Sequence, residues 1–79
     1  MKEIVRLPQW GDEMTEGEVG ECYVQCGDHV DKGDALVAIE IDKTSVEIES
    51  PVSGRVLSIE TEVGKIVPVG SVLAEIETE

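Results

Sequence analysis

Two stretches of the chain repeat each other at a spacing of 37 residues. Residues 17–40 are GEVGECYVQCGDHVDKGDALVAIE, and residues 54–77 are GRVLSIETEVGKIVPVGSVLAEIE. The copies share eight of 24 aligned positions, which in the first copy are Gly17, Val19, Gly27, Val30, Gly33, Leu36, Ile39 and Glu40. Three of these are glycines where turns are expected, and chance rarely aligns glycines at two unequal spacings. We interpret the stretches as two copies of one β unit related by a pseudo-two-fold axis.

Composition favours strands in both copies. Val (12) and Ile (7) far outnumber Leu (4) and Ala (3), and β-branched side chains fit pleated strands better than helices. Eight glycines and three prolines interrupt the chain too often for a long helix. Seventy-nine residues form one domain at most, so we expect a single domain over residues 1–79.

Alternating apolar residues between turn signals locate the strands. Leu36 and Ile39 would lie on opposite faces of a regular strand although both recur, which indicates a bulge or twist between them. Eight short strands predict an all-β fold, a flattened barrel or sandwich of two four-stranded antiparallel sheets. We expect these strands at Glu3–Leu7, Glu18–Gln25, near Val30, Leu36–Ile41, Thr44–Glu49, Gly54–Glu60, near Ile66–Val67 and Val72–Glu77.

The charge of the chain excludes several functions. Six Lys and Arg against 18 Asp and Glu give a net charge of −12, which repels nucleic-acid phosphates and anionic lipids. We therefore expect neither nucleic-acid nor membrane binding, and any charged partner should present a basic or neutral face. No apolar run approaches the roughly 18 residues of a spanning helix, so we expect a soluble protein that is not secreted.

The two cysteines indicate neither a disulfide nor a metal site. Cys22 and Cys26 lie in what we interpret as a strand, where four residues span about 13 Å, too far for a disulfide. A metal would need more ligands than these thiols and His29, the only histidine, can supply. We expect reduced thiols and a solvated loop histidine.

Lys43 lies in the turn of a predicted hairpin. The segment from Ile39 to Ile48 alternates as two strands around Asp42-Lys43. Adding 37 to 43 gives position 80, just beyond Glu79, so the two-fold axis would place this turn opposite both chain ends. An exposed lysine with no neighbouring cation or apolar pocket is a poor nucleophile but an accessible amine for another enzyme to acylate. An ordinary solvated turn lysine is the alternative interpretation.

The chain resembles the lipoyl domain of 2-oxo acid dehydrogenase complexes, the swinging-arm module of the dihydrolipoamide acyltransferase component. The resemblance covers nearly the whole sequence, and related biotinyl domains instead carry Met on both sides of the modified lysine. The motifs that carry it are Leu7-Pro8, Trp10-Gly11, Met14-Thr15-Glu16-Gly17, Gly27-Asp28, Lys32-Gly33-Asp34, Ile39-Glu40-Ile41-Asp42-Lys43-Thr44, Ser50-Pro51, Gly64 and Val67-Pro68-Val69-Gly70.

The resemblance implies a carrier and not an enzyme in its own right. A lipoate ligase or lipoyl transferase would join lipoate to Lys43 by an amide, with Asp42 and Thr44 framing the turn. The arm would carry acyl groups and electrons from a thiamine-diphosphate-dependent decarboxylase to the acyltransferase core, and a dihydrolipoyl dehydrogenase would reoxidise it. The substrate would be a 2-oxo acid or acetoin. Acetoin is suggested because the Trp10-Gly11 pair resembles lipoyl domains of acetoin-type complexes.

The resemblance also suggests how partners recognise the domain. The first surface loop, with Trp10, Gly11, Asp12 and Glu13, would lie near the lysine and help the decarboxylase to choose its domain. Trp10 could instead be a core or edge aromatic, and the two acids ordinary solvated residues. The domain itself is expected to be monomeric and to lie in the cytoplasm, or in the mitochondrial matrix of a eukaryote.

Three other functions stay open at the level of sequence. A biotin carrier would share the fold, and a lipoyl-like interaction module would share it without ever being modified. An acyl carrier protein is also small and acidic, but that fold is helical and uses a serine.

Overall fold

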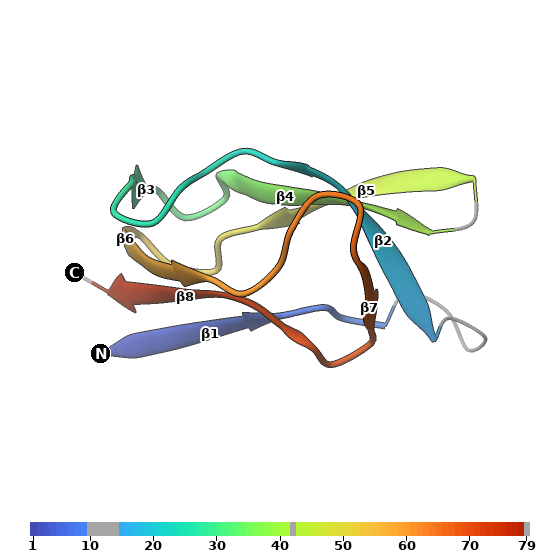
Figure 1. Ribbon diagram of the computed structural model, residues 1–79. Coiled ribbons are helices and arrows are strands. Elements are labelled where there is room, and N and C mark those ends of the chain that lie inside the picture. The colour runs from blue at the N-terminus through green and yellow to red at the C-terminus, as the bar shows by residue number, and fades with distance from the viewer. Residues whose placement is uncertain (10–14, 42, 79) are drawn as a thin grey trace.

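The computed structural model describes residues 1–9, 15–41 and 43–78. This part of the chain forms eight strands and no helix, so it contains no helix able to cross a membrane (Figure 1). The all-β class and the eight strands are confirmed. The strands are β1 (Lys2–Arg6), β2 (Glu16–Cys22), β3 (His29–Val30), β4 (Ala35–Ile41), β5 (Thr44–Glu49), β6 (Gly54–Ile59), β7 (Ile66–Pro68) and β8 (Val72–Thr78).

The strands form two four-stranded sheets with antiparallel pairing throughout. One sheet has the order β1-β8-β6-β3 and the other the order β5-β4-β2-β7. Strands β6, β7 and β8 lie 37 residues after β2, β3 and β4. Replacing each strand by its repeat counterpart converts one sheet order into the other. The pseudo-two-fold relation is confirmed. Each sheet combines strands from both halves of the chain.

Bulges occur at equivalent places in the two sheets. Leu36 has no partner in the register of β4 with β5, and Leu73 has none in the register of β8 with β1. Likewise, Gly20 has no partner in the register of β2 with β4, and Leu57 has none in the register of β6 with β8. The bulge expected between Leu36 and Ile39 is therefore present at Leu36. It breaks the alternation, so that four consecutive residues of β4, from Leu36 to Ile39, are all buried.

The core between the sheets is aliphatic. Because β-branched side chains have few rotamers to lose, Val and Ile fill this thin space at a small entropic cost. Its buried members are Val5, Leu7, Val19, Val30, Leu36, Val37, Ile39, Ile48, Val56, Val67, Leu73, Ala74 and Ile76.

The repeated glycines have two different roles. Gly27 and Gly64 lie in equivalent turns with φ of 97° and 90°, in the left-handed region that favours glycine. Gly17 was expected at a turn but lies in β2, whereas Gly54 begins β6, as expected. A Cβ on Gly54 would collide with the backbone carbonyl of Glu77, so this glycine permits two strands to approach closely.

The end of β2 differs from the sequence prediction. The strand stops at Cys22 and not at Gln25, because the Gln25 amide donates to the Asp28 carboxylate at 2.9 Å in a turn. Cys22 is therefore half-buried at a strand end, and Cys26 is exposed outside the strand, both as free thiols. His29 is exposed as expected, but it lies in β3 and not in a loop.

Tyr23 follows β2 in the sheet of order β5-β4-β2-β7, and its side chain links β2 to β5. Its hydroxyl can donate a hydrogen bond to the carboxylate of Glu21 on β2 or of Glu47 on β5. These glutamates lie on either side of Ala38 of β4 in the strand register. The hydrogen bond to Glu21, followed by desolvation and the bond to Glu47, raises the pKa of Tyr23 from 10.0 to about 12.

Replacing Gly54 by alanine should destabilise the domain by about 1–3 kcal/mol, because the added methyl group forces β6 away from β8. Gly20→Ala is the matched control, since a Cβ there meets its nearest atom at an ordinary 3.5 Å, and its effect should stay within about 0.5 kcal/mol. Urea unfolding of both variants measures the difference. Equal losses of stability in the two variants would contradict the close approach of β6 and β8 at Gly54.

Tyr23 should titrate above its unfolded value. Because its pKa is raised on folding, these contacts stabilise the fold fully below pH 10, and their contribution is lost as the pH rises through about 12. As the only tyrosine, it can be followed by tyrosinate absorbance, with circular dichroism confirming that the protein stays folded. Glu21→Gln should move the midpoint towards 10, and a wild-type midpoint of 10 in folded protein would refute the contacts.

Candidate functional site

The candidate site is the turn between β4 and β5. The last pair of this hairpin joins Ile41 to Thr44, and Lys43 lies exposed between them. Alternating apolar residues on both strands hold the hairpin to the core, with Ile39 and Ile48 buried behind it. The lysine is thus carried by paired backbone on both sides. Asp42 lies outside the described residues.

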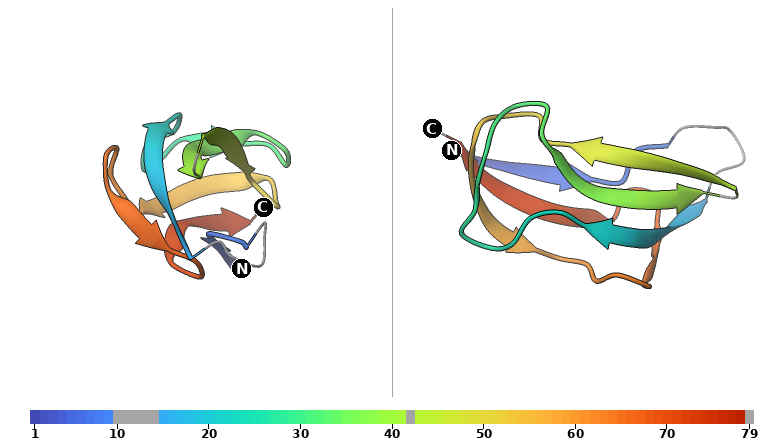
Figure 2. Two further views of the ribbon diagram at one scale, coloured as in Figure 1. Left: turned by 90° about the vertical axis from the view of Figure 1, so that its right-hand side faces the viewer. Right: turned by 90° about the horizontal axis from the view of Figure 1, so that it is seen from above.

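This hairpin is at the end of the molecule opposite the chain termini. Figure 1 and the right-hand view of Figure 2 show the β4–β5 turn at one end and both termini at the other. The termini are held together there, because the Thr78 amide donates to the Met1 carbonyl at 2.7 Å. The molecule extends 36 Å along its longest axis and 21 Å and 18 Å across. The arrangement deduced from the repeat is confirmed.

The surface around Lys43 presents its amine and does not enclose it. A hollow of about 150 Å³ is lined by Glu40, Lys43, Thr44 and Ser45. Sites that bury a small molecule are typically about 300–1,000 Å³, so this hollow is smaller than such a site. The exposed side chains of Thr44 and Ser45 are small and leave the lysine accessible. The geometry fits a group attached covalently to the amine and extending into solvent.

Carboxylates cover the outer face of the sheet that carries the hairpin. Glu18 on β2 lies opposite Glu40 on β4, which lies opposite Ser45 on β5. Two residues further from the turn along β4, Glu21 and Glu47 lie on either side of Ala38. Like charges directly opposite each other destabilise a sheet, so the pair Glu18–Glu40 weakens the fold slightly. We call Glu18, Glu21, Glu40 and Glu47 the acidic face.

The equivalent rows of the other sheet are neutralised. There Glu77, the repeat counterpart of Glu40, lies between Arg55 and Lys2. Lys2 also forms an ion pair of 2.8 Å with Glu75, which raises the pKa of the lysine through the hydrogen bond and charge of that carboxylate. The scaffold is therefore symmetric but its charge is not. Among the described residues, the sheet beside Lys43 keeps an acidic face and the other sheet does not.

Of the site residues predicted from sequence, the structure describes two. It places Lys43 and Thr44 side by side at the turn. Asp42 and the recognition loop, with Trp10, Gly11, Asp12 and Glu13, lie outside the described residues, so their roles stay predictions.

The sequence did not lead us to single out Glu18, Glu21 and Tyr23. A signal for Glu18 was present, because the repeat aligns it with Arg55 and so reverses its charge. No comparable signal existed for Tyr23, whose contacts with Glu21 and Glu47 depend on strand register.

The chain is similar to known proteins over nearly its whole length. The family model described as "Biotin-requiring enzyme", for biotin and lipoyl attachment, matches residues 3–76. The lipoamide acyltransferase component of the branched-chain alpha-keto acid dehydrogenase complex of Pseudomonas aeruginosa is 37% identical over 76 residues, 96% of this chain and 18% of that protein. The dihydrolipoyllysine-residue acetyltransferase component of the pyruvate dehydrogenase complex of Staphylococcus aureus is 40% identical over 72 residues, 91% of this chain and 17% of that protein. The chain thus spans less than a fifth of these relatives.

Solved structures share the fold. The lipoyl domain of the 2-oxoglutarate dehydrogenase complex from Azotobacter vinelandii superposes with a TM-score of 0.79 at 23% identity, covering 96% of this chain and 98% of that one. A region of the urea carboxylase of Kluyveromyces lactis superposes with a TM-score of 0.84 at 27% identity, covering 98% of this chain and 6% of that one. With a family match over nearly its whole length and acyltransferase components among its relatives, the chain belongs to the biotin/lipoyl-attachment family, as a domain of the lipoyl type.

Proposed function

We propose that this domain carries a lipoyl group on Lys43 and moves acyl groups and electrons within a 2-oxo acid or acetoin dehydrogenase complex. The observation that carries the proposal is the position of Lys43, an exposed amine on a paired hairpin at the end opposite the termini. A domain tethered through its ends would hold this amine outward. Tethering raises the effective concentration of the amine near its partners to about the millimolar range.

The residues around the turn suit a long covalent arm. Attachment through an amide removes the charge of the Lys43 ammonium, and the hairpin fixes where the arm begins. When bound, the lipoyl group supplies a strained disulfide that accepts an acyl group together with electrons and is later reoxidised by thiol–disulfide exchange. The protein positions this group, and we assign the chemistry to the partner enzymes.

Lipoate is favoured over biotin by the residues beside Lys43. In this sequence, Asp42 and Thr44 lie on either side of the lysine, whereas biotinyl domains carry Met at both of these positions. Both curated relatives described above are named as acyltransferase components of 2-oxo acid dehydrogenase complexes, and each matches more than nine-tenths of this chain. We place the domain in the cytoplasm, or in the mitochondrial matrix of a eukaryote, where such a complex would operate.

The partners proposed for this carrier are a lipoate ligase or lipoyl transferase, a thiamine-diphosphate-dependent decarboxylase, an acyltransferase core and a dihydrolipoyl dehydrogenase. The acidic face supports a contact between the hairpin-bearing sheet and a basic surface of one of them. Complementary charge accelerates encounter and fixes orientation more than it adds affinity. Asp42 and the loop from Trp10 to Glu13 keep the recognition roles that the resemblance implies, as part of the same proposal.

Incubation with a lipoate ligase, ATP and lipoate should add one lipoyl group, located on Lys43 by peptide mass spectrometry. Lys43→Arg should abolish the modification, because the amine that forms the amide is removed. Lys65→Arg is the matched control, since Lys65 is also an exposed lysine next to a turn, and should leave the modification intact. Lipoylation that persists in Lys43→Arg would overturn the assignment.

Incubation with a biotin ligase, ATP and biotin should leave the protein unlabelled on a streptavidin blot. Asp42 and Thr44 replace the residues that the biotinyl domains place around their lysine, so the ligase should not recognise the turn. Labelling of Lys43 by biotin together with resistance to the lipoate ligase would make this domain a biotin carrier.

Glu18→Arg copies the charge of its repeat counterpart and should reduce kcat/KM of reductive acylation by the cognate decarboxylase about three- to tenfold at low salt. Its stability should stay equal or rise by about 0.2–1 kcal/mol, because the repulsion with Glu40 becomes attraction. Glu62→Arg, an exposed residue outside the acidic face, makes the same change in net charge and should have little effect. Equal losses in both variants would show that only total charge matters.

A further inference from the structure

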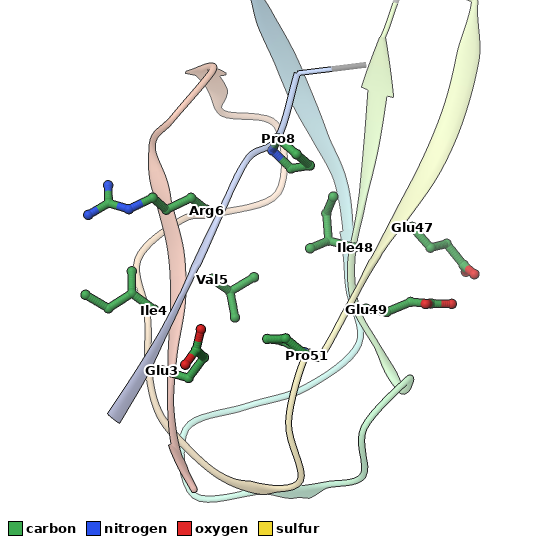
Figure 3. Close-up of a pocket in the computed structure, with 9 residues that line it drawn as sticks. All are labelled: Glu3, Ile4, Val5, Arg6, Pro8, Glu47, Ile48, Glu49 and Pro51. Carbon is green, nitrogen blue, oxygen red and sulfur yellow. The ribbon is translucent and has the colours of Figure 1, made fainter. Parts of the chain in front are cut away.

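A groove separates the edge strands β1 and β5. Each of these strands is the last one in its sheet, and the pseudo-two-fold axis exchanges them. The cavity has a volume of about 440 Å³, within the roughly 300–1,000 Å³ typical of binding pockets. Figure 3 shows its lining from both strands and from the segments that follow them. These residues are Glu3, Ile4, Val5, Arg6, Pro8, Glu47, Ile48, Glu49 and Pro51.

The groove has an apolar floor and an acidic side along β5. Val5, Ile48 and Pro51 point towards one another across the gap, whereas Glu47 and Glu49 point away from it on the outer side of β5 (Figure 3). This follows from the two-residue period of a strand, because Ile48 faces inward when its two neighbours face outward.

Strand β5 offers a free hydrogen-bonding edge beside this floor. It pairs with β4 on one side, and no strand follows it in the sheet order of the described residues. A free edge exposes a row of backbone N–H and C=O groups that can pair with a further strand. An extended segment added there would place alternate side chains in the groove, against Val5 and Ile48, and the others outside, beside Glu47 and Glu49.

Charge distinguishes the β5 edge from the β1 edge. On β1 the outward cations are already engaged, because Lys2 pairs with Glu75 and the Arg6 guanidinium donates to the Gly70 carbonyl at 3.0 Å. On β5, Glu47 and Glu49 have no lysine or arginine as an ion-pair partner among the described residues. An added strand therefore gains complementary charge at β5 if its outward residues are basic.

We propose that the groove is a second docking site, for an extended segment of a partner protein that adds to the edge of β5 and alternates basic and apolar residues. Main-chain pairing would supply affinity, and the alternation would supply specificity: apolar residues enter the groove and basic residues meet Glu47 and Glu49. The site is separate from Lys43 and does not depend on its modification. It would hold a partner while the hairpin end stays free.

The test is a titration of the isotope-labelled 79-residue chain with a capped synthetic peptide in which lysine and valine alternate. We expect saturable binding, with the largest amide shifts along β5 and methyl shifts at Val5 and Ile48. A peptide of the same composition in scrambled order should bind at least about tenfold more weakly, because its side chains cannot follow the period of a strand.

Two modified peptides test main-chain pairing directly. One carries N-methyl groups on every valine and the other on every lysine, so each loses the donors of one edge of the added strand. Because residues two apart direct their N–H groups to the same neighbour, only one of the two should lose binding to β5. Loss in both, or in neither, would exclude strand addition.

Reversing the charges on β5 tests whether the peptide binds at the edge of β5. Glu47→Lys with Glu49→Lys should weaken binding at least about tenfold, whereas Glu60→Lys with Glu62→Lys makes the same change in net charge away from the groove and should have a much smaller effect. Amide spectra confirm that both variants are folded. Equal weakening, shifts centred on β1, or no binding by the alternating peptide would each overturn the proposal.

Discussion

The core shared by two interlocked halves is the constraint on which the rest of the structure depends. The first half of the chain contributes β1 and β3 to one sheet and β2 and β4 to the other, and the second half fills the remaining places in both. Neither half can cover its own apolar face, because each supplies only two strands to a sheet. The halves therefore fold together, and the close approach at Gly54 and the paired bulges belong to that joint packing.

The same packing sets the position of the candidate site. The hairpin that carries Lys43 extends from strands whose inward residues, Ile39 and Ile48, are held in the core. The repeat counterpart of this hairpin is the pair of chain ends, joined between Met1 and Thr78. A two-fold scaffold thus separates the hairpin end from the end that holds both termini, with 36 Å between its extremes. The proposed carrier function requires this separation.

Symmetry of the backbone makes differences in side chains informative. Where the sheet near the termini balances Glu77 with Arg55 and Lys2, the sheet near Lys43 sets Glu40 against Glu18. The packing of the core does not require this contrast, since both sheets have the same order and the same bulges. Carboxylates directly opposite each other destabilise a sheet, so the acidic face does not serve stability, and the partner contact proposed above would give it a role.

The strands, the two-fold relation and the exposed position of Lys43 could be predicted from sequence, because apolar alternation, glycine spacing and an offset of 37 residues are all visible along the chain. The sequence prediction placed the end of β2 wrongly, since the turn that holds Asp28 to Gln25 ends the strand early. Only the tertiary structure brought Glu18, Glu40 and Glu47 onto one face and opened the groove between β1 and β5. Residues distant in sequence meet according to register and sheet order, which bulges and core packing fix and which local pattern does not encode.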